Sequence, residues 1–140
     1  MSVVSDVVSY LAALDIVDGS SDWPSVRGVL HDASDRLVAV RNDGGPQPEI
    51  GAAEGLGSAA FRDPRVHLTV RGGPHDRDST DDKAQEIYDA LHGLMATTLG
   101  ATQYDRIVAE TTPIEVGQDE NARPIHTVAF RLAVAQGAPA

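Results

Sequence analysis

The segment from Gly55 to Ala60 carries the first pattern that could do chemistry. Gly55, Gly57 and Ala60 match the Gly-x-Gly-x-x-Ala form of the dinucleotide-binding fingerprint. That fingerprint binds a pyrophosphate only in the turn between a buried strand and a helix N-terminus. Residues 46–54 show no strand pattern, and Pro64 would end a helix almost as soon as it began. The context therefore favours a loop, and we expect no cofactor.

The histidines are the second group that could do chemistry. No two of them are two or four residues apart, the spacings that bring two imidazoles to one metal ion. His75 with Asp76 and Asp78 could hold an ion, but a solvated polar loop explains that cluster better than a metal site does. His67 and His126 alternate with apolar residues, so we expect both on the less buried face of a sheet. The five histidines are His31, His67, His75, His92 and His126.

The sequence offers no clear candidate residues for covalent or acid–base catalysis either. The chain has no cysteine and no Gly-x-Ser-x-Gly elbow. Most aspartates fall in expected loops and helix starts, where carboxylates cap helices and hydrate the surface. Glu110 and Glu115, near the end of an expected strand, are the best candidates for an acid–base pair, and a surface role is the favoured interpretation for both. We expect no catalytic residue and no metal site.

An acidic cluster is the remaining feature. It consists of Asp76, Asp78, Asp81 and Asp82, diluted by Arg77 and Lys83. Carboxylates at a helix N-terminus are stabilised by the helix dipole, so a solvated helix start explains the cluster. The same charges could form a wall that repels DNA phosphates. The sequence leaves both interpretations open.

Composition bounds the class of protein. The chain has 140 residues, 41% of them hydrophobic and only 4% aromatic, which suits one domain with a modest aliphatic core. Net charge is −10 and Lys83 is the single lysine, so tight binding to a phosphate backbone is not expected. No apolar run is long enough to span a membrane, and Met1–Leu14 lacks the basic start of a signal peptide. We expect a soluble protein, made and used inside a cell.

The periodicity predicts the elements that must position these side chains. Apolar residues recur at helical spacing near the N-terminus and again after Thr80, and at every second position in the strands. We expect Ser79 or Thr80 to cap the second helix and Gly100 to end it. We expect Val128, Phe130 and Leu132 to pack on this helix. The expected elements are a helix over Ser2–Leu14, strands over Arg36–Arg41 and Val66–Val70, the long helix, and strands over Asp105–Thr112 and Ile125–Val134.

The predicted fold class is α+β. We expect a single domain over residues 1–135, with a mostly antiparallel sheet, an N-terminal helix and one long helix packed on the sheet. Residues 136–140 are expected to be a frayed tail. Residues 47–64 are rich in Gly and Ala and have little periodicity. A loop of that length is either functional or ordered by a partner.

The order of these parts resembles the tail terminator and minor capsid proteins of long-tailed, siphovirus-type phages. The likeness covers about Pro64 to Val134, half of the chain, and the N-terminal helix followed by a strand fits the family order too. We could match no landmark in Val26–Leu30 or Gln47–Pro64. Its landmarks are Asp63–Gly72, the helix residues Ala84, Ile87, Tyr88 and Leu91–Gly93, the segment Thr112–Gly117, the loop Asp119–Arg123, and the strand Val128–Val134.

The resemblance implies a structural virion protein without catalytic activity. It implies a homohexameric ring that caps the tail tube and joins it to the head connector, while DNA passes through without specific binding. The implied partners are further copies of the chain, the tail tube protein and the head–tail connector proteins. The implied location is the head–tail junction of the virion, after synthesis in the host cytoplasm.

Two surfaces are candidates for these contacts. The loop Gly117–Arg123 projects from a strand pair, so Asp119, Glu120 and Arg123 are candidate interface residues. The acidic cluster Asp76, Asp78, Asp81 and Asp82 is the candidate wall of the lumen. Two alternatives remain open: a head-closure or adaptor protein at the same junction, and a small dimeric α+β enzyme or ligand-binding domain with convergent polar residues in a closed pocket.

Overall fold

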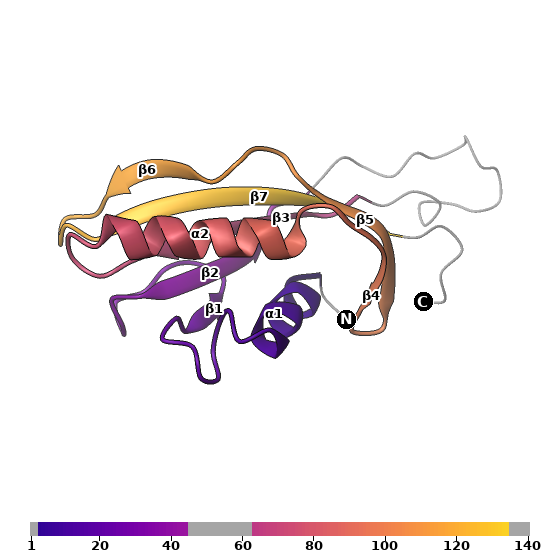
Figure 1. Ribbon diagram of the computed structural model, residues 1–140, viewed down its shortest axis with the longest axis horizontal. Coiled ribbons are helices and arrows are strands. Elements are labelled where there is room, and N and C mark those ends of the chain that lie inside the picture. Colours follow the sequence, from indigo (N-terminus) through magenta and orange to yellow (C-terminus); the bar gives the residue numbers. More distant parts are fainter. Residues whose placement is uncertain (1–2, 45–62, 135–140) are drawn as a thin grey trace.

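The computed structural model describes residues 3–44 and 63–134 (Figure 1). Residues 47–62 of the expected loop lie outside these ranges, and so do the Gly55–Ala60 motif and the predicted tail. The helices and strands are α1 (Val3–Ala13), β1 (Ser25–Arg27), β2 (Leu37–Asn42), β3 (Arg65–Arg71), α2 (Arg77–Leu91), β4 (Leu94–Leu99), β5 (Thr102–Ala109), β6 (Ile114–Gln118) and β7 (Pro124–Val134).

The strands form one sheet around β7. Its order is β1-β2-β3-β7-β5-β4, with β6 also paired to β7. Only β1 and β2 run parallel, and the other pairs are antiparallel. β7 is long enough to share one edge between two partners, since β6 pairs with Pro124–Thr127 and β5 with Phe130–Val134. The predicted α+β fold with a mostly antiparallel sheet is confirmed.

Both helices cover the same face of the sheet. Val128, Phe130 and Leu132 of β7 are buried, as are Ala84 and Ile87 of α2, and all belong to one core. α1 contacts β2 and β4, which lie far apart in the strand order. The sheet must therefore curl, and Figure 1 shows β4 and β5 bending toward α1.

A buried hydrogen bond joins α1 to β5. The hydroxyl of Tyr104 in β5 donates a hydrogen bond of 2.8 Å to Asp6 Oδ2. Both side chains are nearly inaccessible. Asp6 Oδ1 has no hydrogen-bond partner within residues 3–44 and 63–134, so Tyr104 is the main compensation for burying this carboxyl group.

The limits predicted for the long helix were wrong at both ends. The N-cap is Asp76, whose side chain accepts from the backbone N–H of Ser79 at 3.3 Å, and neither Ser79 nor Thr80 caps the helix. The helix ends at Leu91, not at Gly100, because Gly93 turns the chain at φ 89° into β4. Leu94 and Met95 fit helical spacing, but they belong to this strand, which leaves Met95 exposed.

The expected position of His126 was also wrong. His126 shares the inner face of β7 with Val128, because both are even-numbered positions of one strand. It is buried beneath the start of α2, with Nε2 3.5 Å from Asp81 Oδ1. His67 is half-buried on the outer face of β3, as predicted.

Candidate functional site

The two glutamates considered for catalysis take part in ion pairs. Glu110 accepts from Arg65 Nε at 2.6 Å and from Arg131 Nη2 at 3.2 Å. Glu115 lies 3.4 Å from Arg77 Nε. The two carboxylates therefore serve separate guanidinium groups, and they do not form a coupled acid–base pair of the kind expected of an enzyme.

The histidines have structural surroundings. His92 accepts a hydrogen bond from the backbone of Ala109 through Nδ1 and stacks on Tyr88. His75 sits in a turn, and its backbone N–H donates to Ala122. Across the described ranges, no group of three or more His, Asp or Glu side chains is placed to hold a metal ion. No helix in those ranges is both long and apolar enough to span a membrane.

The loop Gly117–Arg123 is organised around a buried arginine. Arg123 donates to Asp119 Oδ2 at 2.7 Å, to Asp32 Oδ1 at 2.7 Å and to Asp35 Oδ1 at 3.4 Å. Its side chain is only 6% exposed. The hydrogen bond from Arg123 lowers the pKa of Asp32, and the same bond raises the pKa of Arg123.

This arrangement divides the three candidate interface residues. Arg123 does not project toward a neighbour, because its guanidinium is already engaged by three carboxylates of its own chain. Asp119 also accepts from the backbone N–H groups of Asn121 and Arg123, which fixes the turn. Glu120 is exposed and has no ion pair with any residue the structure describes. Of the three, Glu120 is the one free to contact another molecule.

A second buried arginine, Arg71, was not singled out from the sequence. It donates to the backbone carbonyls of His31, Ser34 and Asp35 at 2.6–3.0 Å. Burial lowers its pKa, and the nearby positive charge of Arg123 adds to the effect. Arg71 ends a strand of strict alternation, and that pattern predicted only a half-exposed side chain. The partners come from a loop almost forty residues earlier in the chain, which periodicity cannot reveal.

The acidic cluster at the start of α2 also has two kinds of member. Asp76 is the helix cap and also pairs with Arg36 Nη2 at 3.3 Å. The backbone N–H of Ser79 is the main reason that the pKa of Asp76 is lowered. Asp78, Asp81 and Asp82 are exposed. Asp76 therefore has a local structural role. Of the other three, Asp81 lies 3.5 Å from His126 Nε2, and Asp78 and Asp82 have no ion pair with a described residue.

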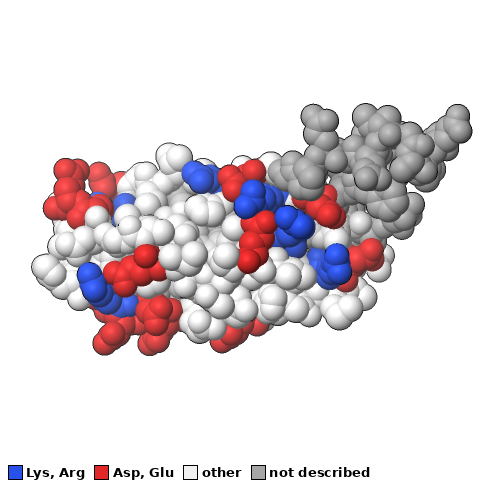
Figure 2. All heavy atoms as spheres, turned by 90° about the horizontal axis from the view of Figure 1, so that it is seen from above, with Lys and Arg blue, Asp and Glu red and all other residues white. Residues whose placement is uncertain are grey.

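The outer face of the sheet carries basic side chains. Arg41, Arg65 and Arg131 lie on three neighbouring strands, and Arg106 lies on β5 opposite Ala133. Figure 2 shows basic and acidic side chains interleaved across this face. We call these four arginines the arginine band. The sequence did not indicate this band because its members are up to ninety residues apart and meet only through strand pairing.

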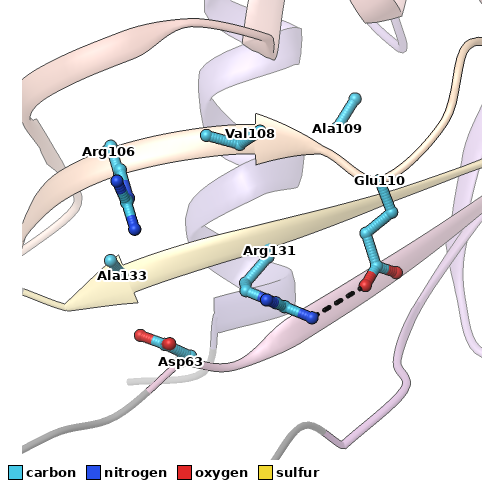
Figure 3. A pocket seen from close by; sticks show the side chains of 7 residues that line it. All are labelled: Asp63, Arg106, Val108, Ala109, Glu110, Arg131 and Ala133. Carbon is cyan, nitrogen blue, oxygen red and sulfur yellow. Dashed lines mark hydrogen bonds and ion pairs between the residues drawn. The ribbon is translucent and has the colours of Figure 1, made fainter.

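A hollow lies within the band (Figure 3). It has a volume of about 450 Å³, and Val108, Ala109 and Ala133 supply its apolar lining. Arg106 of β5, Arg131 of β7, Asp63 and Glu110 supply its charged lining, and Figure 3 shows the guanidinium of Arg131 turned toward Glu110. The hollow is open to solvent and lacks the closed shape that binds a small substrate. It suits a contact with a larger partner better.

A family model described as bacteriophage tail terminator protein matches residues 10–136. This chain belongs to the bacteriophage tail terminator family. It is therefore a structural protein of a phage tail, located in the virion. No curated protein matches the chain.

For this tail terminator protein, the matched range is longer than the likeness seen in the sequence. The expected likeness began at Pro64, whereas the match begins within α1 and includes β1 and β2. The reason is visible in the fold: β2 pairs with β3 along its whole length, so the N-terminal part belongs to the same sheet as the later strands. The siphovirus type remains a prediction.

Proposed function

We propose that this tail terminator protein forms a hexameric ring that caps the tail tube and joins it to the head connector. Membership of the tail terminator family, over residues 10–136, is the observation that carries the proposal. We further propose that residues 1–135 act as a single domain. The described residues support this, because both helices and strands β2, β3, β4, β5 and β7 contribute to one core.

The surface of the subunit suits assembly. A closed ring requires two different, mutually complementary patches on each subunit. Both helices lie on one face of the sheet, and the opposite face carries exposed arginines. Large apolar side chains are also exposed on the strands, among them Met95 of β4, Val108 of β5, and Ile114 and Val116 of β6. Burying such residues against neighbours would add to the modest core of a single subunit.

DNA would pass through the ring without binding. Fixed carboxylates repel phosphates, and the protein carries a net charge of −10. We propose that Asp78, Asp81 and Asp82 face the lumen, with Asp76 holding the helix start that presents them. Their exposure supports this role.

We also propose that the protein catalyses no reaction and binds no cofactor. In support, Glu110 and Glu115 are engaged by arginines, and the hollow on the outer face is open. Neither the head-closure alternative nor the dimeric enzyme or ligand-binding alternative is favoured by a specific feature of the fold.

The experiment is a native mass measurement of the purified protein, with electron microscopy of phage particles that lack it. We expect a species of six subunits, alone or on purified tail tubes. We also expect particles without the protein to accumulate tails not joined to heads, with recovery when the protein is supplied. A stable dimer, or joined particles that do not need the protein, would contradict the proposal.

A further inference from the structure

We propose that the arginine band of one subunit docks on the acidic loop pair of the next copy of this chain. The acidic loop pair is defined by Asp32 and Asp35 of the loop before β2 and by Asp119 and Glu120 of the loop before β7. The inference rests on the proposed ring, and it names the two surfaces that would meet in it.

The arginine band is short of carboxylates. Glu110 is shared by two guanidinium groups, those of Arg65 and Arg131. Arg41 and Arg106 have no ion pair with any residue in the described ranges. Burial is the main cause that lowers the pKa of His67, which lies beside the band; the positive charges of Arg41 and Arg65 lower it further, and the carboxylate of Asp43 opposes them. Two of the four guanidinium groups of the band, those of Arg41 and Arg106, therefore lack a carboxylate partner among the described residues, in a protein whose net charge is strongly negative.

The acidic loop pair has the opposite imbalance. Arg123 pairs with three carboxylates, those of Asp32, Asp35 and Asp119, and Arg71 adds a longer pair with Asp32 at 3.9 Å, so two guanidinium groups serve three carboxylates. Asp32 and Asp35 still have most of their side-chain surface exposed, at 82% and 60%. Glu120 adds a further carboxylate that is exposed and unpaired within the described part of the chain. One surface has unmatched guanidinium groups and the other has unmatched carboxylates, so each offers what the other lacks.

The two surfaces lie at opposite ends of the same strand. β7 begins at Pro124, next to Arg123, and reaches the band at Arg131. Seven strand residues at about 3.3 Å each separate the ends by about 23 Å. One subunit cannot bring its own surfaces together, so their pairing must join two copies. Because the surfaces differ, the contact runs head to tail and can close into a ring.

The hollow gives the contact a place to bury a side chain. Its apolar lining of Val108, Ala109 and Ala133 excludes water around the methylene groups of an inserted residue. Arg106, which has no ion pair with a described residue, then supplies donors to its carboxylate, while Arg131 is paired with Glu110. Asp63 and Glu110 line the same hollow and oppose a polyanion such as DNA. For this reason the observations favour a second copy of the chain over nucleic acid.

The test reverses one free charge on each surface. Arg106→Glu alters the band and Glu120→Arg alters the loop pair, and neither change breaks an ion pair that the structure describes. Each variant alone should weaken assembly about tenfold in 0.1 M salt, as measured by analytical ultracentrifugation. An equimolar mixture of the two should assemble again as an alternating ring, because each reversed surface then meets a reversed partner. The chain that carries both changes should also assemble.

Controls separate the possible failures. Arg27→Glu on β1 and Asp89→Lys in the last turn of α2 reverse exposed charges outside both surfaces and should leave assembly unchanged. If the native protein assembles and both test variants assemble equally well, this contact is wrong while the ring proposal stands. A native protein that stays monomeric, even on tail tubes, overturns the ring and this contact together. Duplex DNA binding that Arg106→Glu abolishes would overturn the contact in favour of a nucleic-acid surface.

Discussion

Single buried residues join the sheet to the helices, and Phe130 is the largest apolar one on β7. Its side chain is 1% exposed and belongs to the core under α2. We expect Phe130→Ala to lower the free energy of unfolding by about 3–5 kcal/mol, because truncation removes buried apolar surface and leaves a cavity. Val108→Ala, on the outer face of the neighbouring strand, is the control and should cost less than about 1 kcal/mol. Chemical denaturation measures both, and equal losses would contradict the assigned faces.

The buried pair of Tyr104 and Asp6 predicts a dependence of stability on alkaline pH. Burial raises the pKa of Tyr104, and the hydrogen bond to Asp6 raises it further. The unfolded chain loses this proton near pH 10, its ordinary value, while the folded protein retains it. Stability should therefore be constant below that pH and fall above it, with a slope of up to about 1.4 kcal/mol per pH unit from this group.

The measurement compares denaturation of the native protein and of Tyr104→Phe between about pH 9 and pH 11. Tyr104→Phe leaves Asp6 without its donor, so it should be less stable near neutral pH by about 1–3 kcal/mol. Its slope in the alkaline range should be flatter, because the group with the raised pKa is gone. Equal slopes in the two proteins would show that Tyr104 titrates normally.

Some turns between strands and helices have room for only one type of residue, and the turn from β3 into α2 is the clearest example. Gly72 lies directly against the first turn of α2: a Cβ atom there would be 1.7 Å from Thr80 Oγ1. That hydroxyl cannot move freely, because it donates to the backbone carbonyl of Asp76 at 2.6 Å. A Cβ atom on Gly73 would meet nothing within 4 Å.

The two adjacent glycines therefore form a matched test of this junction. We expect Gly72→Ala to cost about 1–3 kcal/mol or more, since Thr80 must move and release its hydrogen bond. Gly73→Ala should be neutral or stabilise by up to about 1 kcal/mol, because it restricts the unfolded chain. Thermal denaturation distinguishes the two. Equal effects would mean that α2 does not pack against β3 at this point.

At the scale of the whole molecule, charge predicts how the protein treats DNA. With a net charge of −10, the native protein should show no measurable affinity for a DNA duplex at physiological salt. Replacing Asp78, Asp81 and Asp82 by Lys should create weak DNA binding. This binding should disappear as the salt concentration is raised, because the new lysines bind by releasing counterions from the phosphates, and that release is less favourable at high salt. Electrophoretic mobility shifts at two salt concentrations measure this.

The same variant checks the proposed lumen in the virion. The control replaces the exposed residues Asp15, Asp89 and Asp105 by Lys, which changes the net charge equally but outside the cluster. If the cluster lines the channel, genome passage should slow in the first variant and not in the second. Tight DNA binding by the native protein, or equal passage in both variants, would contradict the acidic lumen.

The sequence by itself determined the strands and the helix faces whose apolar residues follow one clear period. Alternation in β3 and β7 and the 3.6-residue period of α2 place apolar side chains on one side, and hydrophobic burial then fixes which side faces inward. The same reasoning gave the fold class and the resemblance to tail terminators. It was wrong where two periods fit equally well. Leu94 and Met95 continue the helical spacing, and only the turn at Gly93 places them in a strand.

Only the tertiary structure decided the roles of the charged residues. Arg123 draws together carboxylates from two loops, and Glu110 joins arginines from two strands. These partners lie from four to ninety-one residues apart along the chain. An ion pair depends on the distance between two charges in space. The periodic pattern of apolar residues does not give that distance for residues on strands that pair out of sequence order. For the same reason the sequence could offer Asp119, Glu120 and Arg123 as one surface, while the fold buries Arg123 and leaves Glu120 to meet a neighbour.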